Sequence, residues 1–390
     1  MKSLFWTSLF IIFYTFVGYG ILLYILILIR RIFKGKREAP PTSAGELPSC
    51  TLVVAAYNEE GYIRNKIENT LALKYPAGKL RIIFITDGST DSTPVILAKF
   101  PQVHLLHQPE RKGKIAAIHR AMEFVNSDVV VFTDSNTFLN TDALLYICRH
   151  YSDPAIGAVA GEKRILTTGE ADAATAGEGF YWKYESTLKR WDSELHSAMG
   201  AAGELFSVRT DLYQPVSADA ILDDFMISMR IAQEGYRVTY EPDAYAVETA
   251  SQNVSEELKR KVRIAAGGIQ SIIWLKALLN IFKYRTLSFQ YISHRVLRWT
   301  VTPFLLILVF ALNIGLSAQD GSILYNALLA GQLLFYSLAF AGFLLETRQL
   351  RVKVFFIPYY FCVMNYAIGA GIIRFCRGKQ SASWEKSRRK

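Results

Sequence analysis

Long apolar runs at both ends of the chain constrain its fold more than any other feature. Residues 4–29 are almost uninterrupted apolar sequence, and similar runs cover 301–316, 323–345 and 354–373. An apolar helix of about 20 residues can cross a hydrocarbon core roughly 30 Å thick. The sequence therefore predicts an integral membrane protein with its apolar helices grouped at the two ends.

A cleaved signal peptide is the alternative for the first run. The run is longer than a typical signal-peptide core, and no small-residue cleavage site follows it. A basic cluster at residues 30–37 follows instead, so we expect 1–37 to be a membrane anchor. The bias of basic residues towards the cytoplasm places the N-terminus outside and the downstream domain in the cytoplasm. We expect the plasma (inner) membrane.

The last apolar run creates a conflict in topology. If the runs at 301 and 323 both cross, the chain is back in the cytoplasm near Arg348. A full crossing by 354–373 would place the basic tail, 377–390, outside, against the charge bias. Pro358 and Asn365 also make this run a poor straight span. Within 299–376 we therefore expect transmembrane helices followed by an interfacial or re-entrant segment, with a cytoplasmic tail.

The net charge of +10 does not indicate a nucleic-acid partner, because basic residues crowd beside the apolar runs. That placement predicts contacts with anionic membrane lipids. No basic helix has the spacing that reads bases, so we expect no nucleic acid. The four cysteines are scattered without paired spacing, which fits a reduced cytosolic domain.

Between the two ends, residues 48–250 alternate short apolar runs with helical patterns. This succession predicts an α/β domain with a largely parallel sheet covered by helices. Residues 251–298 alternate charged and apolar positions, and we expect amphipathic helices along the membrane interface. The strands are expected at 51–56, 81–86, 103–106 and 129–133, and the helices at 63–73, near 93, near 114–124 and at 221–234.

Acidic residues follow two of the expected strands. Asp87 and Asp134 stand at strand ends, and open α/β sheets bind ligands beyond the carboxyl ends of their strands. Asp134-Ser135-Asn136 presents two oxygen-bearing side chains with one residue between them. Such ligands suit Mg²⁺ or Mn²⁺, although the same triplet is also typical of a turn.

A second acidic pair and a basic pair lie further along the chain. Asp223 and Asp224 begin a helix, where they favour the helix dipole. Adjacent carboxylates also raise each other's pKa, which makes one of them a candidate general base. Arg260 and Arg263 fall on one helical face and could both reach one diphosphate, or could form a solvated basic face.

Taken together, these motifs resemble the membrane-embedded inverting family 2 glycosyltransferases, the group that contains hyaluronan, chitin, cellulose and poly-N-acetylglucosamine synthases. The resemblance covers roughly residues 50 to 270. It rests on the order and spacing of segments 53–60, 86–91, 113–114, 132–137, 200–203, 223–224 and 260–268.

The resemblance implies a GT-A fold and a nucleotide-sugar donor, most often UDP-linked. It also implies a role for each matching residue. Asp224 would be the catalytic base with Asp223 beside it, and Asp134 and Asn136 would hold the metal. Gly203 and Glu204 would lie on the acceptor side. The implied donor-binding residues are Ala55, Tyr57, Glu59, Asp87, Lys114, Asp134, Ser135, Arg260 and Arg263.

In the implied reaction, Asp224 takes the proton while the acceptor oxygen attacks the anomeric carbon and inverts it. The metal and Arg263 offset charge on the leaving nucleoside diphosphate. We expect transfer to a growing polysaccharide; the alternatives are a single addition to a lipid acceptor, similar to ceramide glucosyltransferase, and a non-catalytic scaffold.

Two positions depart from the family pattern. Asn136 replaces an acid of the metal motif, and Ile264 replaces a tryptophan that lies beside the acceptor in processive synthases. The change at Ile264 leaves undecided whether the enzyme extends a chain. Another tryptophan could take the place of the missing one: Trp182, Trp191, Trp274 or Trp384.

Overall fold

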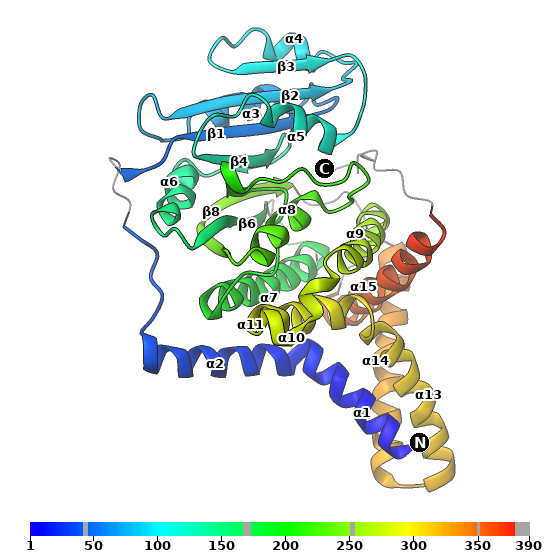
Figure 1. The fold of residues 1–390 in the computed structure, drawn as a ribbon. Helices are drawn as coiled ribbons and strands as arrows, with labels where there is room; N and C mark the ends of the chain where they lie inside the picture. Colours follow the sequence, from blue (N-terminus) through cyan, green and yellow to red (C-terminus); the bar gives the residue numbers. More distant parts are fainter. Residues whose placement is uncertain (42–45, 167–172, 250–253, 349–351, 379–390) are drawn as a thin grey trace.

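The computed structural model describes residues 1–41, 46–166, 173–249, 254–348 and 352–378 (Figure 1). Residues 379–390, most of the predicted basic tail, lie outside the described residues. A sheet of eight strands in the order β3-β2-β1-β4-β7-β6-β8-β5 forms the centre of the domain.

The first half of the sheet is parallel. It consists of β1 (Cys50–Ala56), β2 (Leu80–Asp87), β3 (His104–Gln108) and β4 (Val129–Asp134). Every residue of β1 is buried, because helices cover both faces of the sheet. The four expected strands are therefore present, each within two residues of its predicted bounds. The prediction of a mostly parallel sheet in an α/β domain is confirmed.

The second half of the sheet is mixed and was not predicted strand by strand. β7 (Phe206–Arg209) pairs antiparallel with both β4 and β6 (Ile156–Leu166). β8 (Arg237–Thr249) runs parallel to β6, and the two-residue β5 (Phe138–Leu139) closes the edge.

The helices divide the domain into two apolar cores, one on each face of the sheet. On one face, α5 (Lys114–Met122) packs over β1 and β2, and α8 (Asp223–Gln233) packs over β6 and β8. On the other face lie α3 (Ile63–Leu71) and α6 (Ala143–Cys148), with the short α4 (Thr93–Leu97) near the edge. Lys114 and the Asp223-Asp224 pair thus stand at the first turns of α5 and α8.

The N-terminal apolar run forms a bent helix rather than one straight span. α1 (Lys2–Phe13) joins α2 (Tyr19–Lys34) through a π-helical turn, a common place for a helix to bend. In Figure 1, α1 points away from the domain beside α13 (Thr302–Asp320) and α14 (Ile323–Thr347), whereas α2 lies across the base of the domain near α7 (Ala173–Leu195).

The C-terminal helix packs against α9. α15 (Lys353–Cys376) crosses α9 (Val254–Trp274) at small residues, and a Cβ built on Gly371 would lie 2.6 Å from the Cβ of Ala265. Between α9 and α13 the chain forms a 3₁₀ turn at Lys276–Leu279, α10 (Ile281–Tyr284), α11 (Thr286–Tyr291), the π-helical turn η6 (Ile292–Val296) and α12 (Leu297–Trp299).

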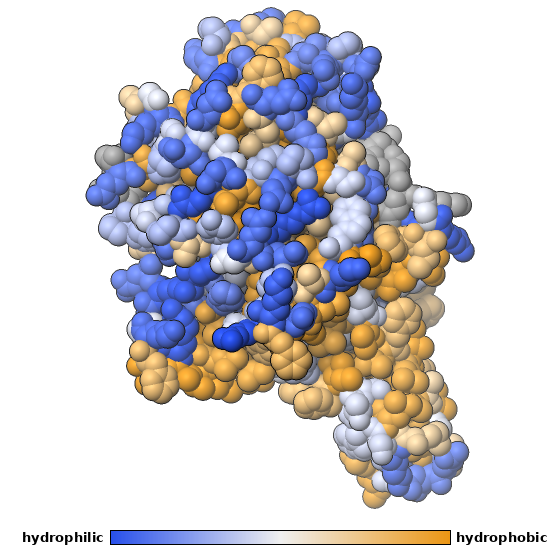
Figure 2. Space-filling model, viewed as in Figure 1, coloured by the Kyte–Doolittle hydropathy of each residue, from blue (hydrophilic) through white to orange (hydrophobic). Residues whose placement is uncertain are grey.

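Four helical stretches are long and apolar enough to cross a membrane: 2–34, α13, α14 and α15. Apolar surface covers the base of the domain and the arm formed by α1, α13 and α14, whereas the tip of the arm is polar (Figure 2). At that tip Lys2 lies 3.0 Å from Asp320. This pattern suits a membrane protein; the number of crossings and the side of the C-terminus stay predictions.

Candidate active site

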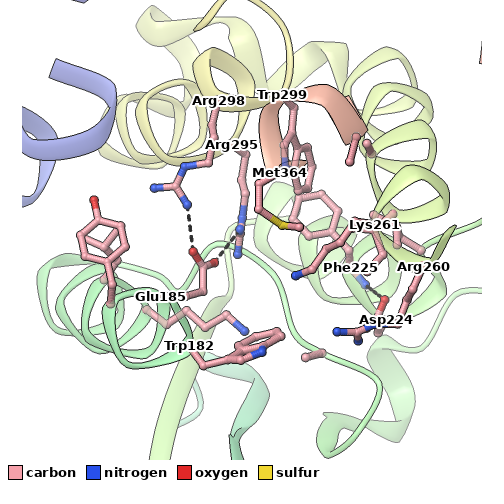
Figure 3. A pocket seen from close by; sticks show the side chains of 18 of the residues that line it. Trp182, Glu185, Asp224, Phe225, Arg260, Lys261, Arg295, Arg298, Trp299 and Met364 are labelled. Carbon is pink, nitrogen blue, oxygen red and sulfur yellow. Dashed lines mark hydrogen bonds and ion pairs between the residues drawn. The ribbon is translucent and has the colours of Figure 1, made fainter. Parts of the chain in front are cut away.

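A cavity of about 1620 Å³ opens at the carboxyl ends of the parallel strands and extends between α7, α9 and α15. Figure 3 shows Asp224 and Arg260 on one side of it and Glu185 on the other. The cavity brings together ten of the predicted site residues: Glu59, Lys114, Asp134, Asn136, Gly203, Glu204, Asp223, Asp224, Arg260 and Arg263. The other four, Ala55, Tyr57, Asp87 and Ser135, do not line it.

Lys114 lies between the carboxylates of Asp134 and Asp223. Its Nζ lies 2.7 Å from Oδ1 of Asp134 and 3.9 Å from Oδ2 of Asp223. Burial alone would lower the pKa of the Lys114 ammonium, but the charges of Asp134 and Asp223 outweigh it and raise the pKa. Lys114 therefore stays charged, and its positive charge reduces the repulsion between the carboxylates of Asp134 and Asp223.

Asp224 has the electrostatics of a general base. Burial, reinforced by the charge of Asp223, raises its pKa from the ordinary value of 3.8 to about 7, although Lys114 opposes the shift. The backbone N–H of Phe225 donates to Oδ1 of Asp224 at 2.8 Å, which orients the carboxylate. A base whose pKa lies near neutrality can both take and release a proton efficiently.

Gly203 leaves open the space on which these groups converge. A Cβ at this position would lie 3.2 Å from Nζ of Lys114, 3.4 Å from Oδ2 of Asp224 and 3.8 Å from Oδ2 of Asp134. A methyl group here would push the Lys114 ammonium by a few tenths of an ångström and would occupy the space between the three groups.

We expect Gly203→Ala to lower sugar transfer by up to roughly 100-fold, the cost of a small displacement of reacting groups. Gly61→Ala is the matched control, since a Cβ there meets nothing within 4 Å. Both variants should keep the wild-type thermal midpoint. Full activity in Gly203→Ala would contradict the placement of the reacting atoms above Gly203.

Asp87 is buried and organises the loop that leads to Lys114. Its carboxylate accepts hydrogen bonds from the backbone N–H groups of Lys112 at 3.0 Å and Gly113 at 2.6 Å. The ring of Tyr57 faces the guanidinium of Arg111, 3.9 Å from its centroid. The nucleoside contacts predicted for these two residues stay predictions, and Arg111 is a neighbour that sequence reasoning missed.

Ala55, Glu59 and Ser135 surround the same strand ends. Ala55 is buried in β1 and pairs in register with Asp134 of β4. Glu59 and Ser135 are also buried. These positions shape the floor of the site through the backbone and through burial.

The two arginines of α9 differ in their surroundings. Arg260 makes two hydrogen bonds to Glu257, at 2.9 and 3.0 Å, one turn earlier on the same helix. Arg263 lies near Asp223, Asp224 and Asp134. Burial lowers the pKa of Arg263, and the nearby charge of Asp223 opposes that shift. Of the two arginines, Arg263 is therefore the one whose charge lies near these three carboxylates.

Glu204 belongs to an ion cluster that the sequence did not reveal. Lys163 of β6 forms short ion pairs with Glu204 and with Glu248 of β8. Burial would raise the pKa of Glu204, but the charge of Lys163 outweighs it and holds the pKa below its usual range. Glu204 is thus ionised and fixed, as suits a residue that positions others.

Lys66 contacts the residues on either side of Asp134 and Asn136. Sequence reasoning did not identify it. It is fully buried, and its Nζ donates to Oγ1 of Thr133 at 3.1 Å and to the carbonyl of Thr137 at 2.6 Å. Burial lowers its pKa to about 7, although Asp134 opposes the shift. The signal was available, because Lys66 falls on the same helical face as Ile63, Ile67 and Thr70.

Three tryptophans line the cavity. Trp182 and Trp191 line it, as does Trp299, which sequence reasoning did not consider. Trp274 is not among the lining residues, and Trp384 lies outside the described residues. Trp299 packs on Phe225, with ring centroids 5.5 Å apart.

The sequence of the central domain resembles known proteins. Residues 51–214 match the family model described as glycosyl transferase family 2. Poly-beta-1,6-N-acetyl-D-glucosamine synthase of Staphylococcus aureus is 28% identical over 255 residues, 63% of this chain and 60% of that protein. Beta-monoglucosyldiacylglycerol synthase of Nostoc is 29% identical over 183 residues, 45% of this chain and 37% of that protein.

The alignment thus spans 60% of the length of the Staphylococcus relatives. Among solved structures, mannosyltransferase PcManGT from Pyrobaculum calidifontis, in complex with GDP-Man and Mn²⁺, superposes with a TM-score of 0.73 at 23% identity. The similarity covers 97% of this chain and all of that one. The predicted GT-A-like fold is confirmed.

Proposed function

We propose that this enzyme, a glycosyltransferase with a family 2 domain at residues 51–214, moves a sugar from a nucleotide-sugar donor to an acceptor hydroxyl at the membrane, with inversion. One observation carries the proposal: Lys114, Asp134 and Asp224 converge on the open space above Gly203. A donor diphosphate fits between Asp134 and Arg263, and the acceptor hydroxyl fits beside Asp224.

A divalent cation fits the donor side of this space. Asp134 and Asn136 both line the cavity and offer oxygen ligands, which Mg²⁺ and Mn²⁺ prefer. No group of three or more His, Cys, Asp or Glu residues within the described parts of the chain could hold a metal. The two side chains would therefore hold the cation together with donor phosphates. When bound, it would offset negative charge on the leaving diphosphate.

The residues of the chain itself supply the remaining chemistry. Asp224 accepts the proton of the acceptor hydroxyl as its oxygen attacks the anomeric carbon from the face opposite the diphosphate. Lys114 and Arg263 add positive charge on the donor side, where negative charge develops. One displacement inverts the anomeric carbon, and no covalent intermediate with the enzyme forms.

The acceptor end of the cavity favours an acceptor attached to a lipid. Val17 of the π-helical turn and Ile21 and Ile25 of α2 line it on one side. Phe361 and Ile368 of α15 line it on the other. An apolar wall suits an acyl or prenyl chain better than a bare polysaccharide. The lipid carries either one sugar or a growing glycan, which accommodates both kinds of relative.

Incubation of the purified full chain with labelled UDP-, GDP- and dTDP-sugars and a membrane lipid extract tests this function. We expect a labelled product that partitions into organic solvent and whose formation stops after chelation of divalent cations. Asp134→Ala should abolish transfer and Asp211→Ala, at an exposed position, should not. Label found only in a lipid-free polymer would contradict the lipid-attached acceptor, and transfer that survives chelation would remove Asp134 and Asn136 as metal ligands.

A further inference from the structure

The cavity wall opposite Asp224 holds more cations than carboxylates. Nη1 of Arg295 lies 2.6 Å, and Nη1 of Arg298 2.9 Å, from the carboxylate of Glu185. Figure 3 shows both arginines pointing at Glu185, on the far side of the cavity from Asp224. One buried carboxylate thus faces two guanidinium groups in the wall of the cavity.

Lys189, one turn along α7 from Glu185, adds a third cation. The side chain is only 7% exposed, yet it lines the cavity. Its ammonium group forms no hydrogen bond or ion pair with any residue that the structure describes. Burial lowers the pKa of Lys189, and the charge of Glu185 opposes that shift. The ring of Tyr240 lies 6.0 Å from its Nζ. A ring face does not neutralise an ammonium charge, so this position suits an anion that arrives with a ligand.

Lys261 completes the wall from α9. Its Nζ lies 3.6 Å from Oε1 of Glu257 and 5.2 Å from the ring centroid of Trp182. Lys261 and Trp182 both line the cavity. We call Lys189, Lys261, Arg295 and Arg298 the basic wall. Its members come from four elements, α7, α9, η6 and α12, so the convergence of their charges is a property of the fold. Ammonium and guanidinium groups arranged in this way match the oxygens of a phosphate.

An apolar passage lies next to the basic wall. The cavity continues between the α2 segment and α15, where apolar side chains line both sides. Ile21 and Ile25 also belong to the exposed apolar surface of α2, which forms part of the apolar base of the molecule (Figure 2). A ligand that entered from a membrane at this base would meet the passage first, then the basic wall, then Asp224.

We propose that the basic wall binds the phosphate of a lipid-phosphate-linked acceptor, with the apolar chain between α2 and α15 and the sugar hydroxyl towards Asp224. This inference rests on the proposed function and names its substrate class. A neutral glycolipid or a free polysaccharide would leave Lys189 without a counter-charge. The anion is therefore specified by the same wall that separates the catalytic base from the membrane.

Binding of farnesyl phosphate and farnesol to the purified full chain in detergent, measured by calorimetry, tests the inference. We expect farnesyl phosphate to bind, and Lys189→Met to weaken its Kd roughly 10- to 100-fold, the range for a hydrogen bond to a charged group. Lys189→Arg should restore binding, which separates lost charge from misfolding. Arg190→Met is the matched control, because Arg190 is the next residue on α7 and is exposed.

Equal affinity for farnesol and farnesyl phosphate would overturn the inference, and so would equal effects of Lys189→Met and Arg190→Met. A phospholipid headgroup has similar chemistry and is tested by competition. Displacement of farnesyl phosphate by phosphatidylglycerol at the same affinity would overturn the assignment to an acceptor. Failure of phosphatidylglycerol and of inorganic phosphate to displace it would support that assignment.

Sugar transfer measured in parallel separates the two proposals. Lys189-dependent binding without transfer from any nucleotide sugar would sink the proposed function and leave the phosphate site standing. Transfer with an acceptor KM that is unchanged in Lys189→Met would sink the phosphate site alone. We expect Lys189→Met to raise the KM for phosphate-linked acceptors and to leave the donor KM unchanged.

Discussion

Asp224→Asn is expected to reduce kcat by about 10²–10⁴-fold, the contribution typical of a positioned general base. Asparagine keeps nearly the shape of aspartate and can still accept the hydrogen bond that Phe225 N–H donates to Oδ1. It cannot take a proton from the acceptor hydroxyl. The measurement is transfer of a labelled sugar under saturating donor, compared with the wild-type chain and with Asp211→Asn as an exposed control.

The raised pKa of Asp224 fixes the direction of the stability change. In the folded protein the carboxyl of Asp224 keeps its proton up to about pH 7, whereas the ordinary pKa of an aspartate is 3.8. Stability from this group is therefore present at low pH and is lost as the pH rises through about 7. Asparagine carries no charge, so the thermal midpoint of Asp224→Asn at alkaline pH should equal or exceed that of the wild type.

Two further outcomes check the assignment of the base. In the wild type, kcat/KM should fall as the pH drops below about 7, because the base becomes protonated. This limb should be missing from the residual activity of Asp224→Asn. Undiminished transfer in the variant, or an unchanged limb, would place the base elsewhere.

Asp192→Ala is expected to destabilise the protein by about 3 kcal/mol or more, because each buried polar group left without its acceptor costs roughly 1–3 kcal/mol. Asp192 is fully buried on α7 and lies 2.5 Å from Nδ1 of His294. It also accepts a short hydrogen bond from the hydroxyl of Tyr19 and one of 3.0 Å from Gln290. The substitution leaves three fully buried polar groups from α2, α11 and η6 without this shared acceptor.

The thermal midpoint in detergent, followed by tryptophan fluorescence, reports this loss. Asp192→Asn is the matched control, since it keeps the volume and one acceptor oxygen, and it should lose less stability than the alanine variant. Identical midpoints for the wild type and Asp192→Ala would mean that this contact does not hold α2 against the domain.

Local sequence was enough to predict the half of the sheet that carries Asp87 and Asp134. Runs of buried β-branched residues predicted β1 to β4, and short-range rules placed Asp87 and Asp134 at the ends of two of them. The same reasoning placed Lys114 and Asp224 at helix starts. These features depend on neighbours within a few residues, so the pattern of the chain contains them.

Contacts between distant segments were not predictable in the same way. The strands β6 to β8 alternate in direction, and no local pattern states which strand each will pair with. His294 meets Asp192 across 102 positions of sequence, and Arg298 meets Glu185 across 113. A charged residue in a helix has the same local pattern whether it faces water or an ion pair.

The sequence by itself thus determined the apolar helices, the parallel strands and the acidic residues at their ends, because hydrophobic periodicity and turn chemistry act over short distances. Only the tertiary structure decided that α1 and α2 diverge, that α15 covers α9, and that Lys189 lines the same cavity as Asp224. Those properties follow from which surfaces pack together, and packing depends on the whole chain.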